Sequence, residues 1–393
     1  MTDIFIIGAA RTAIGSFGGS LASLRPADLA EIAIRESITR AGVPVGEIEH
    51  TVVGNVIPTQ PEDAYVARVA AVRAGIPVGA PAMTVNRLCG SGLQAIISAA
   101  QMIALGECTL AVGAGAESMS NAPHHVLTAR FGRKLGDQSM LDALIGALTD
   151  PFERVHMGVT AETVAERCAI TREDQDALAA ESHARAARAI AEGRFKEQIV
   201  PVELKGREGT TRFDTDEHVR SDTTLESLAS VRAAFQKDGT VTAGNSSGIN
   251  DGAASVVLAS GDAVLQKGLL PLARIIGWGH AGVDPKVMGL GPVTAVPIAL
   301  NRAGVSLDQI DVIESNEAFA AQACAVAKGL GFDTHKTNPN GSGISLGHPI
   351  GATGAILTVK CLYELRRTNG KYGLVTMCIG GGQGIAMVIE NCA

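Results

Sequence analysis

The sequence predicts an α/β protein made of two related halves, with a charged segment inserted into the first. Three observations lead to this fold class. Short apolar stretches alternate with amphipathic ones, as in a mostly parallel sheet that carries helices on both faces. The composition suits close packing of helices on sheets, because 46% of the 393 residues are hydrophobic, 46 are glycine and only 3% are aromatic. Two short motifs of the first half also recur in the second.

The first half contains two well-marked helices between predicted strands. The helix over residues 26–40 has Pro26 near its start and Gly42 just past its end, which are the usual positions of these two residue types. A second helix follows residue 89, because apolar residues recur at helical spacing over residues 93–104. The strands are predicted at residues 3–8, 51–55 and 109–115.

The character of the sequence changes between residues 121 and 244. This segment holds 16 Lys or Arg and 20 Asp or Glu, so 36 of its 124 residues are charged, whereas the other 269 residues hold 37 charges. We therefore expect a solvent-facing excursion from the core. It includes a helix over residues 171–192, which Thr171 and Asp174 open as a capping box. The core resumes with a strand at residues 254–258.

The second half echoes the first in two places. The sequence RAGV occurs at residues 40–43 and again at 302–305, and GSG occurs at 90–92 and again at 341–343. We interpret the echoes as a duplication, in which each GSG precedes a helix and then a strand. Two related α/β halves would form a site at their junction, near the carboxyl ends of the strands. The further elements are a helix at residues 352–365 and strands at 311–314, 374–379 and 385–389.

Cys89 is the first candidate for chemistry. It lies in the sequence NRLCGSG, a glycine-flanked turn that leads into the helix after residue 89. The free N–H groups and the positive dipole end of a helix N-terminus favour a thiolate. The glycines at 90 and 92 let a substrate approach the sulfur closely. The alternative for this turn by itself is a buried, inert cysteine.

Three more candidates lie in glycine-rich or strand-end positions of the second half. Asn316 follows the strand at 311–314, and His348 lies between Gly347 and a proline at the entry to a helix. A histidine on an apolar face is usually structural, whereas one in such a turn is more often directed into a cavity. Cys378 ends a strand and leads into the run GGGQG, which a tight hairpin explains better than a dinucleotide fingerprint does. The sequence contains no P-loop, GxSxG or HExxH motif.

Bulk properties exclude several classes of function. The formal net charge is −7 and no Lys/Arg cluster is present, so we expect no nucleic-acid partner. No apolar run reaches about 18 residues, and the first residues resemble neither a secretory leader nor a transit peptide, so we expect no membrane association. The seven cysteines are scattered and form no CxxC pair, which predicts neither disulfides nor a metal site. A reducing cytoplasm is the expected compartment.

Taken together, four motifs resemble those of the thiolases, a family of acyl-CoA acetyltransferases. They are NRLCGSG around Cys89, NEAF around Asn316, GHPIGATG around His348 and CIGGGQG around Cys378. The resemblance covers essentially the whole chain and is strongest to bacterial biosynthetic β-ketothiolases. It implies two βαβαβαββ halves in an αβαβα layered arrangement, with an inserted loop domain. The implied boundaries are residues 1–120 plus 245–270 for the N-terminal half, 121–244 for the insert and 271–393 for the C-terminal half.

The reaction of such an enzyme is a reversible Claisen condensation of two CoA thioesters to a 3-ketoacyl-CoA. It needs a nucleophile to hold one acyl group, a base for the α-proton of the other and donors for two oxyanions. Cys89 would be the nucleophile and His348 would accept its proton. Cys378 would be the base, if its surroundings lower its pKa toward neutrality. The resemblance implies that His348 and a water on Asn316 bind the enolate oxygen, and that the N–H groups of Cys89 and Gly380 bind the tetrahedral intermediate.

The resemblance also implies a cleft for CoA between the insert and the core. No tightly bound cofactor is expected, and the partners are acetyl-CoA, CoA and 3-ketoacyl-CoA. The segment at residues 123–141 resembles the loop that joins two dimers into a homotetramer. For Arg220, a solvated surface charge is the alternative to a role in binding. The residues implied to line the cleft are His156, Met157, Arg220, Ser227, Phe235, Ala243, Ser247, Ala318 and Phe319.

Two other functions fit the same fold. A decarboxylating 3-ketoacyl synthase pairs its cysteine with two histidines or with a histidine and an asparagine, whereas this sequence offers Cys378. A non-catalytic acyl-CoA or lipid carrier need not retain the nucleophile, whereas this sequence has Cys89, His348 and Cys378. Activity on malonyl thioesters alone would favour the synthase, and failure of acetyl-CoA to modify Cys89 would favour the carrier.

Overall fold

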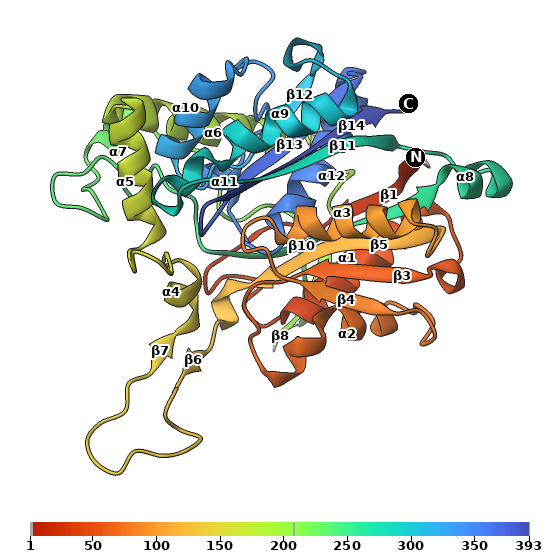
Figure 1. Cartoon of the computed structure of the whole chain (residues 1–393), viewed down its shortest axis with the longest axis horizontal. Helices are drawn as coiled ribbons and strands as arrows, with labels where there is room; N and C mark the ends of the chain where they lie inside the picture. Colours follow the sequence, from red (N-terminus) through yellow and green to blue (C-terminus); the bar gives the residue numbers. More distant parts are fainter. Residues whose placement is uncertain (1–2, 207–208, 393) are drawn as a thin grey trace.

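A computed structural model describes residues 3–206 and 209–392 and has the predicted layers of helices and sheets (Figure 1). The strands are β1 (Ile4–Arg11), β2 (Gly15–Ser16), β3 (His50–Gly54), β4 (Ala82–Val85), β5 (Leu110–Ser118), β6 (His124–His125), β7 (Leu141–Asp142), β8 (Val202–Gly206), β9 (Gly209–Phe213), β10 (Asn250–Ser260), β11 (Ala273–Gly282), β12 (Val312–Ser315), β13 (Tyr372–Ile379) and β14 (Gln383–Asn391). The helices are α1 (Pro26–Ala41), α2 (Val66–Arg73), α3 (Ser91–Ala104), α4 (Ala143–Ala147), α5 (Met157–Cys168), α6 (Arg172–Ala191), α7 (Leu225–Ala229), α8 (Gly261–Lys267), α9 (Gly291–Ala303), α10 (Ala320–Leu330), α11 (Gly343–Leu346) and α12 (Thr353–Thr368). Short 3₁₀ turns are η1 (Val45–Glu47), η2 (Pro61–Tyr65), η3 (Met119–Asn121), η4 (Pro285–Leu290) and η5 (Leu307–Gln309).

The main sheet is mixed, so the prediction of a mostly parallel sheet is wrong. Its strand order is β12-β13-β14-β11-β1-β10-β5-β3-β4. Only the two ends of this order are parallel, at β12–β13 and along β5–β3–β4. The central strands are antiparallel because β14 returns from β13 through a tight hairpin and β10 returns only after the insert. Alternation of strands and helices along the chain does not reveal either return.

The two halves share a short seam and then diverge. Strands β1 and β11 pair only through Phe5 with Arg274 and Ile6 with Ala273. Beyond the seam, α3 and α12 fill the space between the two parts of the sheet and carry much of the apolar core. Helices α1 and α2 cover one outer face and α9 covers the other (Figure 1). The predicted αβαβα layering is therefore present, with the two chain ends on the same side of the molecule (Figure 1).

The helix signals in the sequence act as predicted. Helix α1 has Pro26 at its first turn and ends at Gly42, whose φ is +66°. Its counterpart α9 ends at Gly304, also at φ +66°, so the repeated RAGV marks two equivalent helix ends. Helix α6 begins with the predicted capping box of Thr171 and Asp174. No described helix is long and apolar enough to cross a bilayer.

The second echo is misplaced in the sequence analysis. Helix α3 starts directly after Gly90, but the GSG at 341–343 leads only into the single turn α11, and α12 begins later, at Thr353. The counterpart of Gly92 in the second half is Gly354. A Cβ on Gly92 would lie 2.8 Å from the backbone nitrogen of Ala355, and a Cβ on Gly354 would clash with the backbone nitrogen of Leu93. The two helices therefore cross symmetrically at a pair of glycines.

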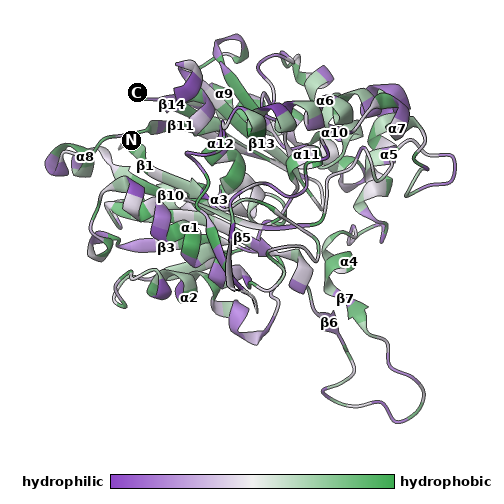
Figure 2. Ribbon diagram, turned by 180° about the vertical axis from the view of Figure 1, so that it is seen from behind, coloured by the Kyte–Doolittle hydropathy of each residue, from purple (hydrophilic) through white to green (hydrophobic). Residues whose placement is uncertain are grey.

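The insert is less exposed than its charge suggests. Helices α5 and α6 pack on α10 of the second half. The fully buried guanidinium of Arg11 in β1 bonds both oxygens of Asp216, at 2.7 and 2.9 Å, which ties the insert to the first half. The segment between β6 and β7 leaves the body of the molecule as a long loop (Figures 1 and 2). This extended loop exposes Leu127, Phe131, Leu135 and Met140.

Candidate active site

Cys89 lies in the turn between β4 and α3, one residue before the helix cap. Leu88 has φ +45°, a left-handed conformation that costs a residue with a side chain about 1–2 kcal/mol. The hydroxyl of Ser91 holds the turn, because it donates to the Leu88 carbonyl and accepts from the Arg87 N–H. A Cβ on Gly90 would lie 2.6 Å from the side chain of Ile379. Gly90 therefore lets the hairpin that carries Cys378 lie against the Cys89 turn.

The backbone N–H groups of Cys89 itself and of Gly380 act to lower the pKa of the Cys89 thiol. Burial nevertheless raises the pKa of the Cys89 thiol, and the nearby carboxyl group of Glu117 acts in the same direction. The predicted preference for a thiolate at this helix start is therefore outweighed by burial. Gly380, in the hairpin of Cys378, contributes to the electrostatics of the Cys89 sulfur.

Cys378 is almost fully buried at the end of β13. The predicted hairpin is present: Cys378 pairs with Gly384 across the ladder, and Gly381 and Gly382 turn the chain at φ +82° and +86°. Burial, with a contribution from Cys89, raises the pKa of the Cys378 thiol. The expectation that its surroundings lower this pKa is wrong for the ligand-free protein, because apolar side chains surround the sulfur.

His348 is buried and held at both its backbone and its ring. Its N–H donates to Asn250 Oδ1 at 3.0 Å, and its Nδ1 lies 2.7 Å from the hydroxyl oxygen of Thr353. The preceding Gly347, at φ +108°, leaves no room for a side chain against Asn250. Burial lowers the pKa of His348 to about 4, so the ring is neutral near pH 7. A neutral ring can accept a proton.

Asn316 follows β12 and is fully buried next to this histidine. Its Nδ2 lies 3.5 Å from both ring nitrogens of His348, at the outer limit of a hydrogen bond. Its Oδ1 has no hydrogen-bond partner among the described residues. An unsatisfied buried amide oxygen costs about 1–3 kcal/mol, so this position favours a bound water or a polar substrate atom.

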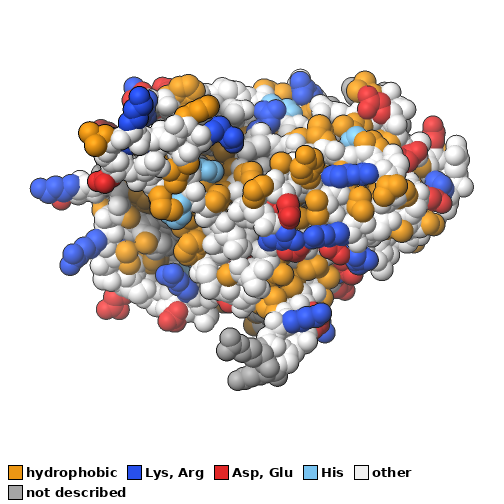
Figure 3. Space-filling model, turned by 90° about the horizontal axis from the view of Figure 1, so that it is seen from below, with side chains coloured by type: hydrophobic (Ala, Val, Ile, Leu, Met, Phe, Trp, Pro, Cys, Tyr) orange, Lys and Arg blue, Asp and Glu red, His pale blue; other side chains and the backbone are white. Residues whose placement is uncertain are grey.

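A cavity of about 520 Å³ opens from His348 to the surface. Phe235 stacks on the His156 ring, with centroids 4.8 Å apart, and meets Phe319 edge-on at 6.0 Å. Histidine and hydrophobic side chains share the face of the molecule that Figure 3 shows. The cavity is lined by Ser16, Phe17, Met119, Leu148, His156, His183, His218, Arg220, Ala234, Phe235, Ala243, Gly244, Ser246, Ser247, Gly248, Ile249, Phe319, Ile344, His348 and Ile350.

Most residues predicted to bind CoA line this cavity, and three do not. Met157 and Ala318 instead pack in the apolar cluster around Cys378. Ser227 is exposed in the first turn of α7, where its hydroxyl donates to the Thr224 carbonyl. A second cavity of similar volume lies between α6 and α10, and none of the predicted catalytic residues lines it. Of the predicted catalytic residues, His348 lines the first cavity.

Comparison with known proteins assigns this arrangement to a family. A family model of the thiolase N-terminal domain matches residues 4–262, and a model of the thiolase C-terminal domain matches residues 269–391. The chain belongs to the thiolase family. Thiolases are acyltransferases, and this one joins acetyl-CoA to an acyl-CoA to form a 3-ketoacyl-CoA, or cleaves that product with CoA. Of the functions weighed from the sequence, the β-ketothiolase is the one supported.

Individual relatives match this thiolase along its whole length. Beta-ketothiolase BktB of Cupriavidus necator is 59% identical over 390 residues, which cover 99% of both chains. An acetyl-CoA acetyltransferase of Pseudomonas aeruginosa is 48% identical and covers 100% of both. A solved human mitochondrial 3-ketoacyl-CoA thiolase in complex with CoA has a TM-score of 0.97 at 44% identity, covering 100% of this chain and 98% of that one.

The thiolase cleft contains two histidines that the sequence analysis missed. His183, on α6, accepts a hydrogen bond from the Arg220 N–H at 3.1 Å. Burial lowers the pKa of His183 to about 4, and His218 and Arg220 act in the same direction. His218 stands two residues before Arg220 in the sequence. The predicted role of Arg220 could therefore have indicated that His218 also lies at the cleft. No local sequence signal links His183 to the cleft.

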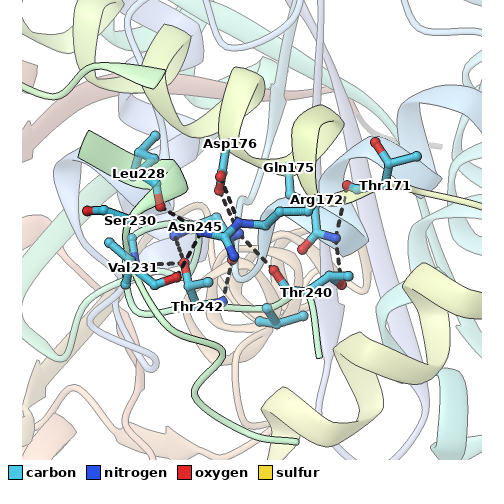
Figure 4. Close-up of polar contacts among 12 residues, drawn as sticks. Thr171, Arg172, Gln175, Asp176, Leu228, Ser230, Val231, Thr240, Thr242 and Asn245 are labelled. Atoms are coloured by element: carbon cyan, nitrogen blue, oxygen red, sulfur yellow. Dashed lines mark hydrogen bonds and ion pairs between the residues drawn. The ribbon is translucent and has the colours of Figure 1, made fainter. Parts of the chain in front are cut away.

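A polar network shapes one wall of the thiolase cleft (Figure 4). The amide of Asn245 donates to Asp176 at 2.9 Å, and its oxygen accepts from the Thr242 N–H at 2.8 Å (Figure 4). Arg172 binds the other oxygen of Asp176 at 2.7 Å and the carbonyl of Leu228 at 2.6 Å. The loop that presents Ala243 and Ser247 to the cavity is therefore anchored on α6.

Proposed function

We propose that Cys89, His348, Cys378 and Asn316 carry out the two half-reactions of this thiolase. The observation that supports the proposal is that these residues, which come from four separate segments, meet in two pairs. The Cys89 turn lies against the hairpin of Cys378, and the amide of Asn316 lies next to the ring of His348. Each of these segments ends a strand or starts a helix, so their backbones are fixed by the core.

In the first half-reaction, Cys89 attacks the carbonyl carbon of an acyl-CoA. Its proton passes to His348 Nε2, because Nδ1 already faces Thr353. The oxyanion of the tetrahedral intermediate accepts hydrogen bonds from the N–H groups of Cys89 and Gly380, both of which act to lower the pKa of the Cys89 thiol. The C–S bond to CoA then breaks, CoA leaves as its thiol with the proton held by His348, and the acyl group remains on Cys89.

In the second half-reaction, Cys378 first passes its thiol proton to His348 Nε2, and the resulting thiolate removes the α-proton of acetyl-CoA. His348 returns its proton to the Cys89 sulfur when the acyl group leaves it. The enolate oxygen is bound by His348 and by a water on Asn316, whose oxygen otherwise lacks a partner among the described residues. The enolate carbon attacks the acyl thioester and frees Cys89. Because burial raises the pKa of Cys378, its thiolate is a strong base, and its thiol is the proton donor when the reaction runs toward cleavage.

We propose the cavity of about 520 Å³ as the CoA cleft. The human relative solved with CoA supports this, since its fold and length match those of this chain. His156, Phe235 and Phe319 offer apolar faces to the pantetheine arm, and Arg220 offers a charge to the phosphates. Ala243 and Ser247 line the same cavity, whereas Met157, Ala318 and Ser227 would act from its edge.

The proposal also covers the domain boundaries, the oligomeric state and the cellular compartment of this thiolase. We propose an N-terminal half of residues 1–120 plus 245–270, an insert of 121–244 and a C-terminal half of 271–393. The exposed apolar residues of the extended loop support a homotetramer, because such side chains are normally covered by a partner. Seven free cysteines support a reducing, cytoplasmic setting.

Cleavage of a series of 3-ketoacyl-CoA substrates by CoA tests the proposed function. Acetoacetyl-CoA should be cleaved by the native enzyme and not by the Cys89→Ala variant. Activity confined to this substrate would define a short, closed acyl site, and activity on longer members would define an open one. Absence of cleavage for the whole series, or normal turnover by Cys89→Ala, would overturn the proposal.

A further inference from the structure

We propose that Thr353 is a positioning residue that holds the His348 ring in the tautomer with a proton on Nδ1 and a free electron pair on Nε2. The inference rests on the proposed role of His348 as proton acceptor. Its basis is a short hydrogen-bonded chain at the start of α12. The Thr353 oxygen lies 2.7 Å from His348 Nδ1, and its hydroxyl donates to the Pro349 carbonyl at 2.9 Å.

The direction of this chain is part of the proposal, because the Thr353 hydroxyl has one proton and could give it to Pro349 or to His348 Nδ1. We assign that proton to the Pro349 carbonyl, which also accepts from the N–H groups of Ala352 and Thr353. The remaining lone pairs of the Thr353 oxygen can then only accept, so the proton between Thr353 and His348 belongs to Nδ1. A neutral imidazole carries one N–H, which leaves Nε2 without a proton. Nε2 is therefore the atom that can take the proton of Cys89.

The surroundings of Thr353 leave it no direct role toward substrate. It is 2% exposed, and it is not among the residues that line the cavity of His348. Asn250 holds only the backbone of His348, and the ring has its shortest polar contact with the Thr353 hydroxyl at 2.7 Å, against 3.5 Å for the amide of Asn316. A wrong tautomer would present an N–H to the Cys89 thiol and could not accept its proton.

The test compares Thr353→Val, Thr353→Ser and a matched control, Thr358→Val, in full-length enzyme. Thr358 lies on the same helix, is fully buried, and donates to the Gly354 carbonyl at 2.8 Å in the same i to i−4 geometry, but contacts no histidine in the described structure. Thr353→Val should lower kcat for acetoacetyl-CoA cleavage by about 10- to 100-fold and leave KM within about twofold. Thr353→Ser should stay within about threefold of native kcat, and Thr358→Val within about twofold.

Three outcomes would overturn the proposal. Thr353→Val could retain native kcat, Thr353→Ser could lose as much as Thr353→Val, or Thr358→Val could lose as much as Thr353→Val. The last two would mean that helix packing, and not the hydroxyl, sets the rate. His348→Gln is assayed beside them. If His348→Gln retains native turnover, the proposed role of His348 itself fails; an inactive His348→Gln with an active Thr353→Val rejects Thr353 alone.

Discussion

At the scale of single residues, burial favours the uncharged forms of the two cysteines and the histidine at the candidate site. Burial raises the pKa of the Cys89 and Cys378 thiols and lowers that of His348 to about 4. The chain supplies donors and acceptors for charges that appear only during the reaction, such as the paired N–H groups at Cys89 and the free oxygen of Asn316. Electrostatic stabilisation of this kind acts most strongly in a water-poor site.

Replacing Cys378 with serine separates the two half-reactions. Serine is close to cysteine in shape, but its hydroxyl is a far weaker acid than a thiol. It therefore does not form the anion that acts as the base. Condensation of acetyl-CoA should fall by about a thousandfold or more, while acylation of Cys89 continues. Product formation and intact-protein mass spectrometry measure the two steps. Cys392→Ser, at an exposed cysteine, is the control; normal condensation by Cys378→Ser would assign the base elsewhere.

The pKa of His348 also predicts how stability depends on pH. Because it is lowered from 6.5 to about 4, the unfolded chain binds a proton between these values that the folded chain does not. The contribution of the neutral His348 to the free energy of unfolding is present above pH 6.5 and is lost as the pH falls toward 4. From pH 7 to pH 5 this group should cost the native enzyme about 2 kcal/mol.

Urea unfolding of the native enzyme and His348→Gln, at equal protein concentration, isolates this contribution. Other buried histidines, such as His183, titrate in both proteins and cancel in the difference. The free energy of unfolding of the native enzyme relative to the variant should fall by about 2 kcal/mol between pH 7 and pH 5. A difference that does not change with pH would contradict the buried, neutral histidine.

At the scale of elements, the crossing of α3 and α12 brings the two halves of the site together. Cys89 stands before one helix and His348 before the other, so their relative placement depends on how closely the helices approach. The approach is set by Gly92 and Gly354. Each leaves room for the backbone of the opposite helix, which no side chain at either position would allow.

Gly354→Ala should therefore destabilise the enzyme. The new Cβ would lie 2.6 Å from Leu93 Cβ and against the Leu93 backbone, which cannot move without shifting α3. We expect a loss of about 3 kcal/mol in the free energy of unfolding and a lower kcat. Gly329→Ala in α10 is the control, because its Cβ would meet only a Val293 methyl group, at 3.3 Å.

Urea unfolding and acetoacetyl-CoA cleavage measure both variants. The Gly329→Ala variant should match the native stability or exceed it by up to about 1 kcal/mol. If Gly354→Ala is as stable and as active as the control, the close crossing does not fix the site.

At the scale of the whole molecule, the extended loop between β6 and β7 projects away from the body of the protein (Figure 1). Phe131 in this loop is 94% exposed, so its aromatic ring is not buried within a single chain. Light scattering coupled to gel filtration should give the mass of four chains for the native enzyme and of two for Phe131→Glu. Leu265→Glu, at an exposed leucine of α8, should stay tetrameric. A native mass other than four chains, or an unchanged mass for Phe131→Glu, would reject the tetramer proposal.

Local signals in the sequence predict much of the fold. Pro26 and Gly42 bound α1, Thr171 and Asp174 cap α6, and the glycines after Cys378 turn the hairpin, because each effect depends on neighbouring residues only. The order of strands in the sheet was not predictable in this way. β10 pairs with β1 across about 240 residues of chain, and no local pattern records such a partner.

At the candidate site, too, local motifs identify residues, whereas properties that depend on the fold could not be predicted. The four motifs identify Cys89, Asn316, His348 and Cys378, whose roles stay predictions that the geometry supports. The direction of the cysteine pKa shifts was missed, since burial depends on the apolar side chains that surround each sulfur in the fold. His183 was missed because it reaches the cleft from a helix with no motif of its own.

The central claim is that the acyl group is carried by Cys89. The most direct measurement incubates the native enzyme with acetyl-CoA, quenches it with acid and locates the acetyl group by peptide mass spectrometry. We expect one acetyl group, on the peptide that contains Cys89, and none in the Cys89→Ala variant. An acetyl group on Cys378, or an unmodified Cys89 in an enzyme that still cleaves acetoacetyl-CoA, would contradict it.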